Sequence, residues 1–421
     1  MLDLKFIREN RDLVSRGLKA KNSKFDLQEL LHCDTKRRAA VQEVEELKRQ
    51  RNLANDQIVS FKKSGQAIQV EEAISQMRSV SQKIDEFDKE VGGIDEKMTN
   101  LLLNIPNLPH IDVPISETPA GNKVVREWGK PKVFSFKPKE HLEIANKQGW
   151  ISMERGSKIS GAGFPVYLGK GARLERALIN FMLDFHTKKH GYTEVWVPAL
   201  VNRQSMTGTG QLPKFEEDMY QLKHEDYFLI PTAEVPITNL LRNEVLNEAD
   251  LPVKYTGYTP CFRREAGSYG KDTRGLSRVH QFDKIEMVKF VKPEKGIEEL
   301  ELLVKDAEDI LQALELPYRV LLLCSADMSF SAAKCYDLEV WAPGTQKWFE
   351  VSSCSLFTDF QARRINVKYR PSGVQNKSEY VHTLNGSGVA LARTVLCLLE
   401  NGQTEQGEIQ FPTALEPYLD C

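Results

Sequence analysis

Two long stretches near the start of the chain place their apolar residues at alternating intervals of four and three. In the first, this spacing connects positions 40, 44, 47, 51, 54, 58 and 61, which hold Ala, Val, Leu, Arg, Ala, Ile and Phe. In the second, it runs from Val70 through Ala73, Met77, Val80, Ile84, Phe87, Val91, Ile94, Met98 and Leu101. Such a seam is typical of helices that pack as a coiled coil. Because a polar segment with Gly65 separates the stretches, the pattern predicts an antiparallel helical hairpin.

The predicted hairpin is long for a compact domain. A helix from about Lys36 to Lys63 would span roughly 40 Å, so we expect the hairpin to project as an arm. Its outward positions mix acids with the basic residues Lys36, Arg37, Arg38, Lys48, Arg49, Lys62 and Lys63. The pattern is open to two interpretations, a solvated surface supported by ion pairs or an arm that binds nucleic acid, and periodicity alone favours the first.

A proline-rich passage at 104–114 ends the helical pattern and reads as a linker. It predicts an N-terminal helical domain at 1–104 and a second domain at 105–421. In the second, short β-branched or aromatic runs alternate irregularly with helical stretches near 172–188, 296–314 and 389–400. The runs lie at 193–197, 227–230, 285–291, 319–323 and 337–341. Because βαβ repeats would alternate regularly, we predict an α+β domain on an antiparallel sheet.

Charge becomes informative only locally. The chain of 421 residues has a formal charge of -2, so its overall balance indicates no partner. One segment, 259–288, nevertheless carries Arg263, Arg264, Lys271, Arg274 and Arg278 between two apolar runs, which predicts two strands joined by a long loop. Guanidinium groups match phosphate oxygens, so this loop suits a triphosphate. On residue types alone, a solvated basic hairpin is an equal alternative.

The surrounding motifs decide between these alternatives. The loop contains Phe262-Arg263-x-Glu265, then Gly275-Leu-x-Arg278-x-His-Gln-Phe282-x-x-x-Glu286. The chain also contains Thr232-Ala233-Glu234, Glu350-Val351-Ser352-Ser353 and Leu384-Asn385-Gly-Ser387-Gly-Val-Ala-Leu-Ala-Arg393. Taken in their order along the chain, these motifs resemble those of class II aminoacyl-tRNA synthetases. In detail they are similar to the motifs of the seryl-tRNA synthetase family. The resemblance covers the whole length, because that family also begins with a helical hairpin.

The resemblance implies a role for each matching residue. Arg263 would hold the α-phosphate of ATP and Arg278 the outer phosphates, while Arg393 would close on the nucleotide. Glu265 and Phe282 would face the adenine, and the ATP contacts would also include Arg264, Val351 and Ser352. Arg263, Glu265 and Arg393 form the implied catalytic set. Glu350 and Ser353 would hold Mg²⁺. The serine pocket would comprise Thr232, Ala233, Glu234, Arg263, Glu286, Asn385 and Ser387, with Glu286 pairing with the ammonium group.

The resemblance also implies an activity and partners. Serine and ATP would give seryl-adenylate, and serine would then pass to the terminal adenosine of tRNA(Ser). Whether tRNA(Sec) is a second substrate stays open, and no residue is identified as proton acceptor for the transfer. The hairpin would grip the long variable arm of the tRNA. A homodimer would form through the helix beginning near Ala172 and the strand ending at Pro198. No structural zinc is expected.

Three rival functions differ from this interpretation in the residues or segments that they require. An enzyme that loads an amino acid onto a carrier protein would lack the full hairpin. A catalytically silent RNA-binding paralogue would be expected to have lost Arg263, Glu350 or Arg393, and all three are present. A class II synthetase for another amino acid, such as threonine, is disfavoured by the loop at 232–234 and the turn at 385–387.

The remaining features favour ordinary structural roles. His186 and His190 have metal-like spacing but lack the glutamate of a zinc motif, so surface histidines are expected. The glycine pairs at 161–163 and 386–388 lack the third glycine of a dinucleotide-binding loop. Cys261 and Cys354 are interpreted as packing residues. Scattered cysteines, no signal peptide and no long apolar run predict a cytoplasmic protein without membrane contact.

Overall fold

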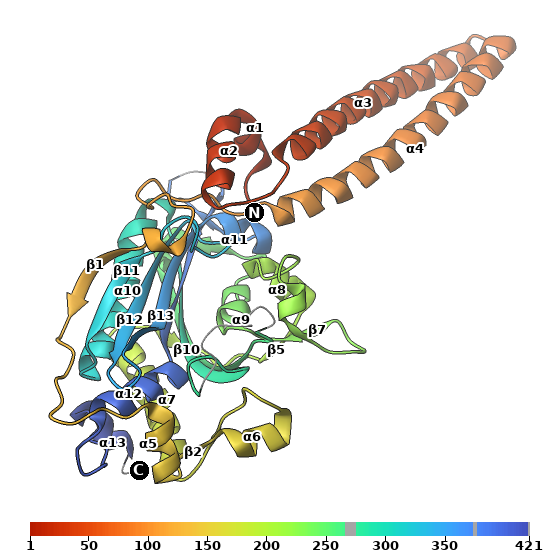
Figure 1. Ribbon diagram of the computed structural model, residues 1–421. Coiled ribbons are helices and arrows are strands. Elements are labelled where there is room, and N and C mark those ends of the chain that lie inside the picture. Colours follow the sequence, from red (N-terminus) through yellow and green to blue (C-terminus); the bar gives the residue numbers. More distant parts are fainter. Residues whose placement is uncertain (266–274, 374–376, 420–421) are drawn as a thin grey trace. The chain divides into compact units, whose positions relative to one another are not determined.

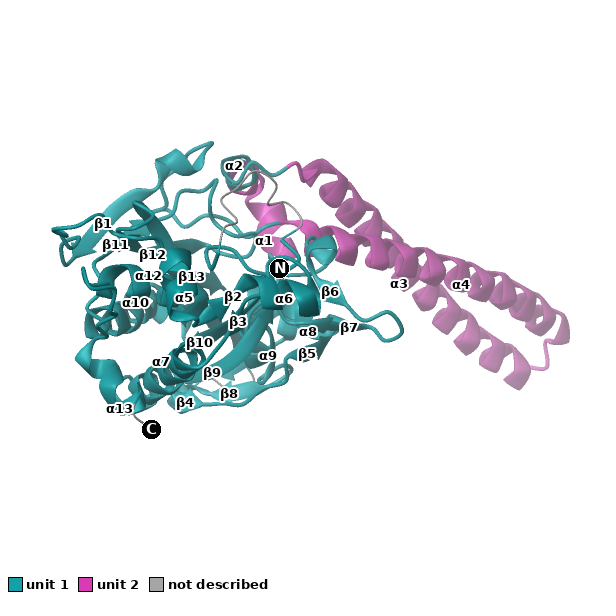
Figure 2. Cartoon of the chain, turned by 60° about the horizontal axis from the view of Figure 1, so that its bottom comes forward, with its two compact units in different colours: residues 1–2, 16–23, 106–421 teal, residues 3–15, 24–105 magenta. Residues whose placement is uncertain are grey.

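The chain forms two compact units in a computed structural model that describes residues 1–265, 275–373 and 377–419 (Figure 1). One unit comprises residues 3–15 and 24–105, and the other comprises residues 1–2, 16–23 and 106–421 (Figure 2). We call them the helical unit and the catalytic unit. In the described ranges, no helix combines the length and apolarity needed to cross a membrane.

The helical unit is dominated by two long antiparallel helices, α3 (Leu27–Lys63) and α4 (Ala67–Asn104), preceded by α1 (Leu4–Glu9) and α2 (Arg11–Ala20). The predicted seam is confirmed, since Val44, Leu47 and Ile58 of α3 are buried, as are Ile84 and Met98 of α4. Gly65 has a positive φ of 73° in the turn between the helices, a conformation that suits glycine. The hairpin prediction is therefore correct.

Helix α3 begins at Leu27, about nine residues before the start at Lys36 that the heptad pattern predicts. The side chain of Asp26 accepts hydrogen bonds from the backbone N–H groups of Gln28 and Glu29, so the helix begins at Leu27. Leu30 and Leu31 in the added turns are buried. The heptad pattern marks the pairing of two helices, whereas this cap and its local packing extend the helix beyond that pattern.

Several basic residues of the hairpin form ion pairs within the helical unit. Arg37 pairs with Asp95 across the two helices, and Lys48 lies 3.5 Å from Asp88. Within α3, Arg38 pairs with Asp34 and Arg49 with Glu46. The side chains of Lys36, Lys62 and Lys63 are exposed. The pairs of Arg37 and Lys48 therefore link the two helices, whereas Arg38 and Arg49 are paired within α3 and remain exposed to solvent.

The catalytic unit is built on an eight-stranded sheet. Its strands are antiparallel except for the parallel pairing of β4 with β9. In spatial order they are β1 (Lys123–Trp128), β11 (Tyr318–Leu322), β12 (Lys334–Ala342), β13 (Lys347–Thr358), β16 (His382–Ala390), β10 (Gln281–Val291), β9 (Val253–Phe262) and β4 (Thr193–Glu194). This sheet confirms the predicted α+β class and differs from the parallel sheet of a dinucleotide-binding fold.

Smaller elements complete the catalytic unit. Short sheets join β2 (Ile151–Ser152) with β3 (Val166–Tyr167); β5 (Leu200–Asn202) with β7 (Tyr227–Leu229) and β6 (Tyr220–Gln221); and β15 (Glu379–Tyr380) with β14 (Lys368–Arg370) and β8 (Val245–Asn247). The helices are α5 (His141–Gln148), α6 (Met153–Ser160), α7 (Lys170–Lys188), α8 (Arg203–Thr209), α9 (Glu234–Asn239), α10 (Gly296–Ala313), α11 (Phe360–Ile365), α12 (Leu391–Gly402) and α13 (Glu416–Leu419).

The two faces of the large sheet have different coverings. Side chains from α7, α10 and α12 form one core with Ile285 and Met287 of β10 (Figure 1). Residues Val288 and Phe290 of the same strand enter a second core with α9 and α11. Because side chains alternate along a strand, Lys284 and Glu286 face away from the first core. That face forms the floor of the candidate site.

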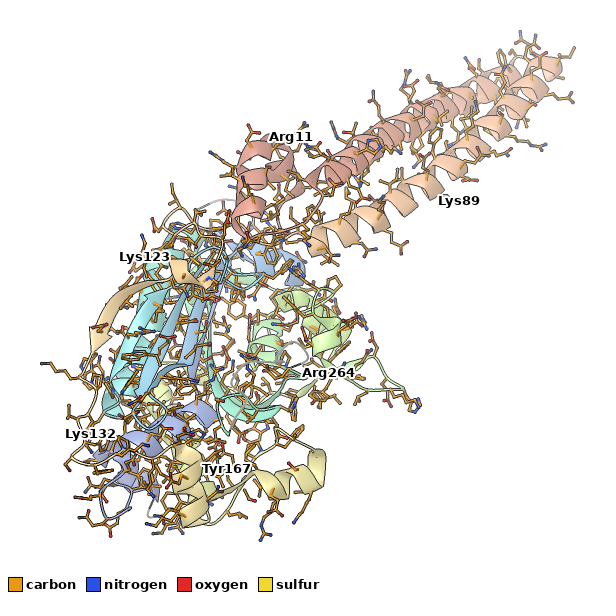
Figure 3. The ribbon with its side chains drawn as sticks, in the orientation of Figure 1. Arg11, Lys89, Lys123, Lys132, Tyr167 and Arg264 are labelled. Atoms are coloured by element: carbon orange, nitrogen blue, oxygen red, sulfur yellow. The ribbon has the colours of Figure 1, made fainter. Side chains whose placement is uncertain are left out.

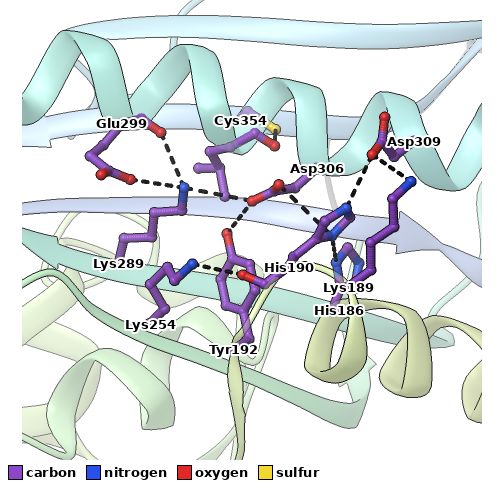
Figure 4. Close-up of polar contacts among 11 residues, drawn as sticks. His186, Lys189, His190, Tyr192, Lys254, Lys289, Glu299, Asp306, Asp309 and Cys354 are labelled. Carbon is purple, nitrogen blue, oxygen red and sulfur yellow. Dashed lines mark hydrogen bonds and ion pairs between the residues drawn. The ribbon is translucent and has the colours of Figure 1, made fainter.

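The expectation of surface histidines at 186 and 190 is wrong. His186 is fully buried and the His190 side chain is only 6 % exposed. Their Nδ1 atoms lie 3.0 Å apart, and His190 Nε2 lies 3.3 Å from Asp309 (Figure 4). Burial lowers the pKa of His186 to about 3, so its ring is neutral. His186 lies on α7, which ends at Lys188 before His190 and packs against β9, β10 and α10. The His190 ring contacts Asp306 and Asp309 of α10.

Candidate active site

A cavity of about 370 Å³ opens on the face of the sheet that carries Lys284. It is lined by twelve residues singled out from the sequence, namely Thr232, Glu234, Arg263, Glu265, Arg278, Phe282, Glu350, Val351, Ser353, Asn385, Ser387 and Arg393. They come from segments as far apart as 232 and 393. The strand-loop-strand unit β9–β10 supplies Arg263 and Arg278, and α12 supplies Arg393. Strands β13 and β16 supply Ser353, Asn385 and Ser387. The sheet therefore brings the sequence motifs into one pocket.

Two irregularities in the sheet set which side chains face the pocket. Between β12 and β13 the register shifts so that Val351 has no partner, and Glu350 and Ser353 both line the cavity although they are three residues apart. A similar shift between β10 and β16 lies beside Ser387 and Val389. An extra residue in a strand reverses the alternation of side chains, which is why β-bulges occur beside active sites.

The arginines lie at the rim of the pocket and are held by neighbouring groups. Arg263 donates to the carbonyl of Pro231 at 3.3 Å, and its guanidinium carbon lies 5.2 Å from the centre of the Phe282 ring. Arg278 pairs with Glu265. The Nη1 atom of Arg393 lies 3.3 Å from Glu350 Oε2 and 2.7 Å from the carbonyl oxygen of that residue. Three fixed cations thus surround one cavity, an arrangement suited to a polyphosphate.

A buried polar cluster around Glu286 lies beneath the pocket. Thr232, Lys284 and Asn385 of this cluster line the cavity, whereas Glu286 itself does not. This carboxylate is fully buried and accepts hydrogen bonds from Thr232 at 3.0 Å and Asn385 at 2.7 Å. Lys284 forms an ion pair with it and donates to the Thr232 hydroxyl at 2.8 Å. Glu234 lies beside the cluster with 7 % exposure. A pocket so dense in fixed donors and acceptors suits a small polar ligand.

Not every predicted residue reaches the cavity. Ala233 is fully buried, and the Ser352 hydroxyl donates to the Ser387 carbonyl at 2.6 Å instead of entering the pocket. Arg264 is exposed and donates to the Glu217 carbonyl at 2.9 Å (Figure 3). Lys271 and Arg274 of the basic loop lie outside the described residues. Cys261 and Cys354 are fully buried, in agreement with a packing role.

Sequence reasoning missed Lys284 and Gln361. Lys284 stands two residues from both Phe282 and Glu286, so the alternation of side chains along a strand could have placed it on the same face. Gln361 donates to the Glu234 carboxylate at 2.6 Å, but 127 residues separate the two in sequence. No local pattern signals such a contact. The cavity also extends to Ser331 and Ser355, for which the sequence analysis proposes no role.

Hard oxygen ligands for a cation are present in the pocket. The Glu350 carboxylate and the Ser353 hydroxyl lie on one strand and both line the cavity. Carboxylate and hydroxyl oxygens fit Mg²⁺, which commonly completes its coordination with water and substrate phosphates. Across residues 1–265, 275–373 and 377–419, no three His, Cys, Asp or Glu side chains gather into a metal site of their own. The residues therefore suit a metal that arrives with a nucleotide.

Comparisons with known proteins identify this architecture. Residues 214–402 match the tRNA synthetase class II core domain (G, H, P, S and T), and residues 1–109 match the seryl-tRNA synthetase N-terminal domain. The serine–tRNA ligase of Pelobacter propionicus is 54% identical over 419 residues, covering 100% of this chain and 98% of that protein. The serine–tRNA ligase of Geobacter sulfurreducens is 51% identical over 419 residues, with the same coverage.

A solved structure agrees with these matches. The crystal structure of seryl-tRNA synthetase from Pyrococcus horikoshii complexed with ATP has a TM-score of 0.94 and 37% identity, and the alignment covers 100% of this chain and 98% of that one. The antiparallel sheet and its arginine-rimmed pocket are thus the catalytic core of a class II aminoacyl-tRNA synthetase. The N-terminal match and the full-length relatives narrow the assignment. The chain belongs to the seryl-tRNA synthetase family.

Proposed function

We propose that this pocket carries out both steps of serine–tRNA ligation. The chain is an ATP-dependent aminoacyl-tRNA synthetase that activates serine and joins it to tRNA. The observation that carries this conclusion is a complete pocket, with three arginines over a buried polar floor, in a chain 54% identical over its full length to a serine–tRNA ligase. In the first step the serine carboxylate attacks the α-phosphorus of ATP and pyrophosphate leaves. In the second, serine passes to the terminal adenosine of tRNA(Ser).

The residues at the rim hold ATP in this proposal. Arg263 contacts the α-phosphate, Arg278 contacts the outer phosphates, and Arg393 closes over the nucleotide. Phe282 is the residue proposed to face the adenine, and Arg263 lies beside its ring. This contact supports a position of Arg263 close to both the adenine and the α-phosphate. Arg264, Val351 and Ser352 complete the proposed ATP contacts. Ser352 would contact ATP through its backbone, because its hydroxyl donates a hydrogen bond to the Ser387 carbonyl on the neighbouring strand.

Mg²⁺ is the proposed metal ion, with Glu350 and Ser353 as its protein ligands. When bound, it would neutralise part of the phosphate charge as pyrophosphate leaves. The pairing of Arg393 with Glu350 brings a guanidinium and a carboxylate to the same part of the pocket. In this proposal Arg393 and the metal ion contact the phosphates at one part of the pocket, and Arg263 contacts the α-phosphate.

The buried floor selects serine. Thr232, Glu234, Glu286, Asn385 and Ser387 surround the amino acid, with Glu286 facing its ammonium group. Alanine would leave buried polar groups without the hydroxyl they are placed to contact, and unmade hydrogen bonds of this kind cost about 1–3 kcal/mol each. Threonine must be rejected by shape, because its extra methyl group needs room beside the same contacts.

Replacing Glu286 with Gln should mainly weaken serine binding. The substitution keeps the shape of the side chain but removes the charge that faces the ammonium group and Lys284. Loss of a charge-assisted hydrogen bond corresponds to about 1.5–3 kcal/mol, so the KM for serine should rise about 10- to 100-fold. The KM for ATP should change little. Both constants can be read from ATP–pyrophosphate exchange.

A matched variant controls for the change of charge. Glu379→Gln removes a carboxylate that contacts Tyr369 and Lys377 outside the pocket, so it should leave both constants near those of the parent. If Glu286→Gln raised the KM for serine and the KM for ATP equally, Glu286 would not be part of the amino-acid pocket.

The helical unit is the proposed tRNA-binding part. In this proposal residues 1–104 hold the long variable arm of tRNA(Ser) and residues 105–421 perform catalysis. The exposed Lys36, Lys62 and Lys63 support phosphate contacts, whereas Arg37 is paired with Asp95 across the two helices. RNA duplexes are generally recognised by shape and backbone contacts, which suits a long helical surface. The proposed enzyme is a homodimer that works in the cytoplasm, and tRNA(Sec) is an open second substrate.

Aminoacylation with a defined set of tRNAs tests the proposal. The enzyme, ATP, Mg²⁺ and labelled serine should charge tRNA(Ser) to completion and leave tRNA(Thr) and tRNA(Ala) uncharged. Parallel reactions with labelled threonine and alanine should give no stable product. Charging of a tRNA that lacks the long variable arm at the same rate would contradict the proposed role of the hairpin.

A further inference from the structure

Four carboxylates lie in or directly beneath the active-site pocket, and three of them contact a cation. Glu265 pairs with Arg278, and Glu286 pairs with Lys284. Glu350 lies 3.3 Å from Arg393. Each of these three carboxylates already has a cationic partner, which suits it to binding and to holding that partner in place.

Glu234 has a different environment. Its Oε1 atom accepts a hydrogen bond from the neutral amide of Gln361 at 2.6 Å, and both side chains are buried. Among the residues that the structure describes, no lysine, arginine or histidine forms an ion pair with Glu234, and no hydrogen bond reaches its Oε2 atom. Because Glu234 lines the cavity, it is available to the substrates.

Gln361 is itself fixed by the protein. Its Oε1 atom accepts from the Thr383 hydroxyl at 2.8 Å, and its Nε2 atom also donates to the Thr209 carbonyl at 3.2 Å. Three chain segments therefore hold the amide with its N–H group toward Glu234: α11 carries it, while β16 and the end of α8 contact it. A hydrogen bond from so restrained a donor fixes the direction of the carboxylate.

We infer that Glu234 accepts the proton of the ribose hydroxyl in the transfer step, and that Gln361 is the positioning residue for this carboxylate. The inference rests on the proposed function and assigns the proton acceptor, a role for which the sequence analysis identifies no residue. As the ribose oxygen attacks the carbonyl carbon of seryl-adenylate, its O–H bond breaks and the proton moves to Glu234. The bond between that carbon and the phosphate oxygen breaks, and AMP leaves with the electron pair.

The electrostatic surroundings agree with this role. Burial, and then the negative charge of Glu286, raise the pKa of Glu234 to about 7, while Gln361, Lys284 and Arg263 act in the opposite direction. A general base works best when its pKa lies near the working pH. Glu234 can therefore be ionised before transfer and still hold a proton after it.

The first test separates transfer from activation. Enzyme-bound seryl-adenylate is formed at saturating serine, then mixed with tRNA(Ser), and charged tRNA is measured over one turnover. Glu234→Gln should lower this transfer rate by about 10²- to 10⁴-fold, the usual contribution of a general base. Serine-dependent exchange should fall much less. A transfer rate equal to that of the parent enzyme would overturn the inference.

The second test uses the pH dependence of transfer and applies even if Glu234→Gln fails to accumulate the adenylate. In the parent enzyme the transfer rate should rise with pH as Glu234 loses its proton. Gln361→Met keeps the size of the side chain but removes the donor that lowers the pKa of Glu234. The inflection should then move to higher pH, so the rate falls at pH 6.5 and approaches the parent rate at pH 9.

These outcomes distinguish the inference from the proposed function. If the parent enzyme shows no serine-dependent exchange, the function itself fails. If exchange is normal and Gln361→Met slows transfer equally at every pH, Gln361 has only a structural role and the assignment of Glu234 is wrong. An alkaline shift in transfer without a matching shift in exchange supports both assignments.

Discussion

Arg263→Ala should abolish serine-dependent ATP–pyrophosphate exchange. The guanidinium lies at the rim of the cavity, against the Phe282 ring and the Pro231 carbonyl, where the α-phosphate is proposed to lie. It would stabilise negative charge that builds up as the serine carboxylate attacks. Losing a transition-state arginine in phosphoryl transfer costs about 10³- to 10⁵-fold in rate, which would bring exchange to the limit of detection.

The controls for this variant address folding and general charge. Arg370→Ala removes an exposed arginine at the end of β14 that does not line the cavity, and it should exchange like the parent. Circular dichroism and thermal melting should match for all three proteins. If folded Arg263→Ala retained a tenth or more of the parent activity, Arg263 would not be the α-phosphate contact.

Removing the hairpin should spare activation and eliminate tRNA charging. Arg37 and Asp95 form an ion pair across the two helices, so residues 38–94 can be replaced by a short glycine-serine turn at a place where the helices are adjacent. The shortened protein keeps every residue that lines the cavity. Exchange should stay within about twofold of the parent, while charging of tRNA(Ser) should fall by more than about 10³-fold because the phosphate contacts are lost.

A full-length variant tests the same idea with the hairpin in place. Replacing Lys36, Lys62 and Lys63 with Ala should weaken tRNA binding and reduce its salt dependence, since each lost phosphate contact lowers the number of released counterions. The matched control replaces the exposed acids Glu43, Glu45 and Glu72 with Ala, which should not weaken binding. Normal charging by the shortened protein would show that the hairpin is not the tRNA-binding arm.

Much of the fold was predictable because two simple sequence patterns carry it. The spacing of Val44, Leu47 and Ile58 records the pairing of two helices, and the run of mostly apolar residues at 285–291 records a buried strand. The start of α3 was not predictable from the seam, since it depends on the cap at Asp26. The burial of His186 and His190 was missed because it depends on α10, which is distant in sequence.

The grouping of the candidate residues was predictable where they occur in ordered motifs. Arg263, Glu265 and Arg393 belong to such motifs, and the fold brings their segments to one cavity. The contact between Glu234 and Gln361 was not predictable, since it joins a helix start to a later helix through tertiary packing. Ser352 shows that a motif can also include a residue whose side chain does not reach the site. Its hydroxyl donates to the Ser387 carbonyl, beside the bulge at Val351, instead of entering the cavity.

ATP–pyrophosphate exchange with each of the twenty amino acids, with Mg²⁺ and without tRNA, tests the central claim most directly. The assay reports formation of the adenylate and names the amino acid in the same experiment. A pocket that fixes Thr232, Glu286 and Asn385 in one buried cluster should support exchange with serine and no other amino acid above background. Exchange with a different amino acid, or none from folded protein, would contradict the account.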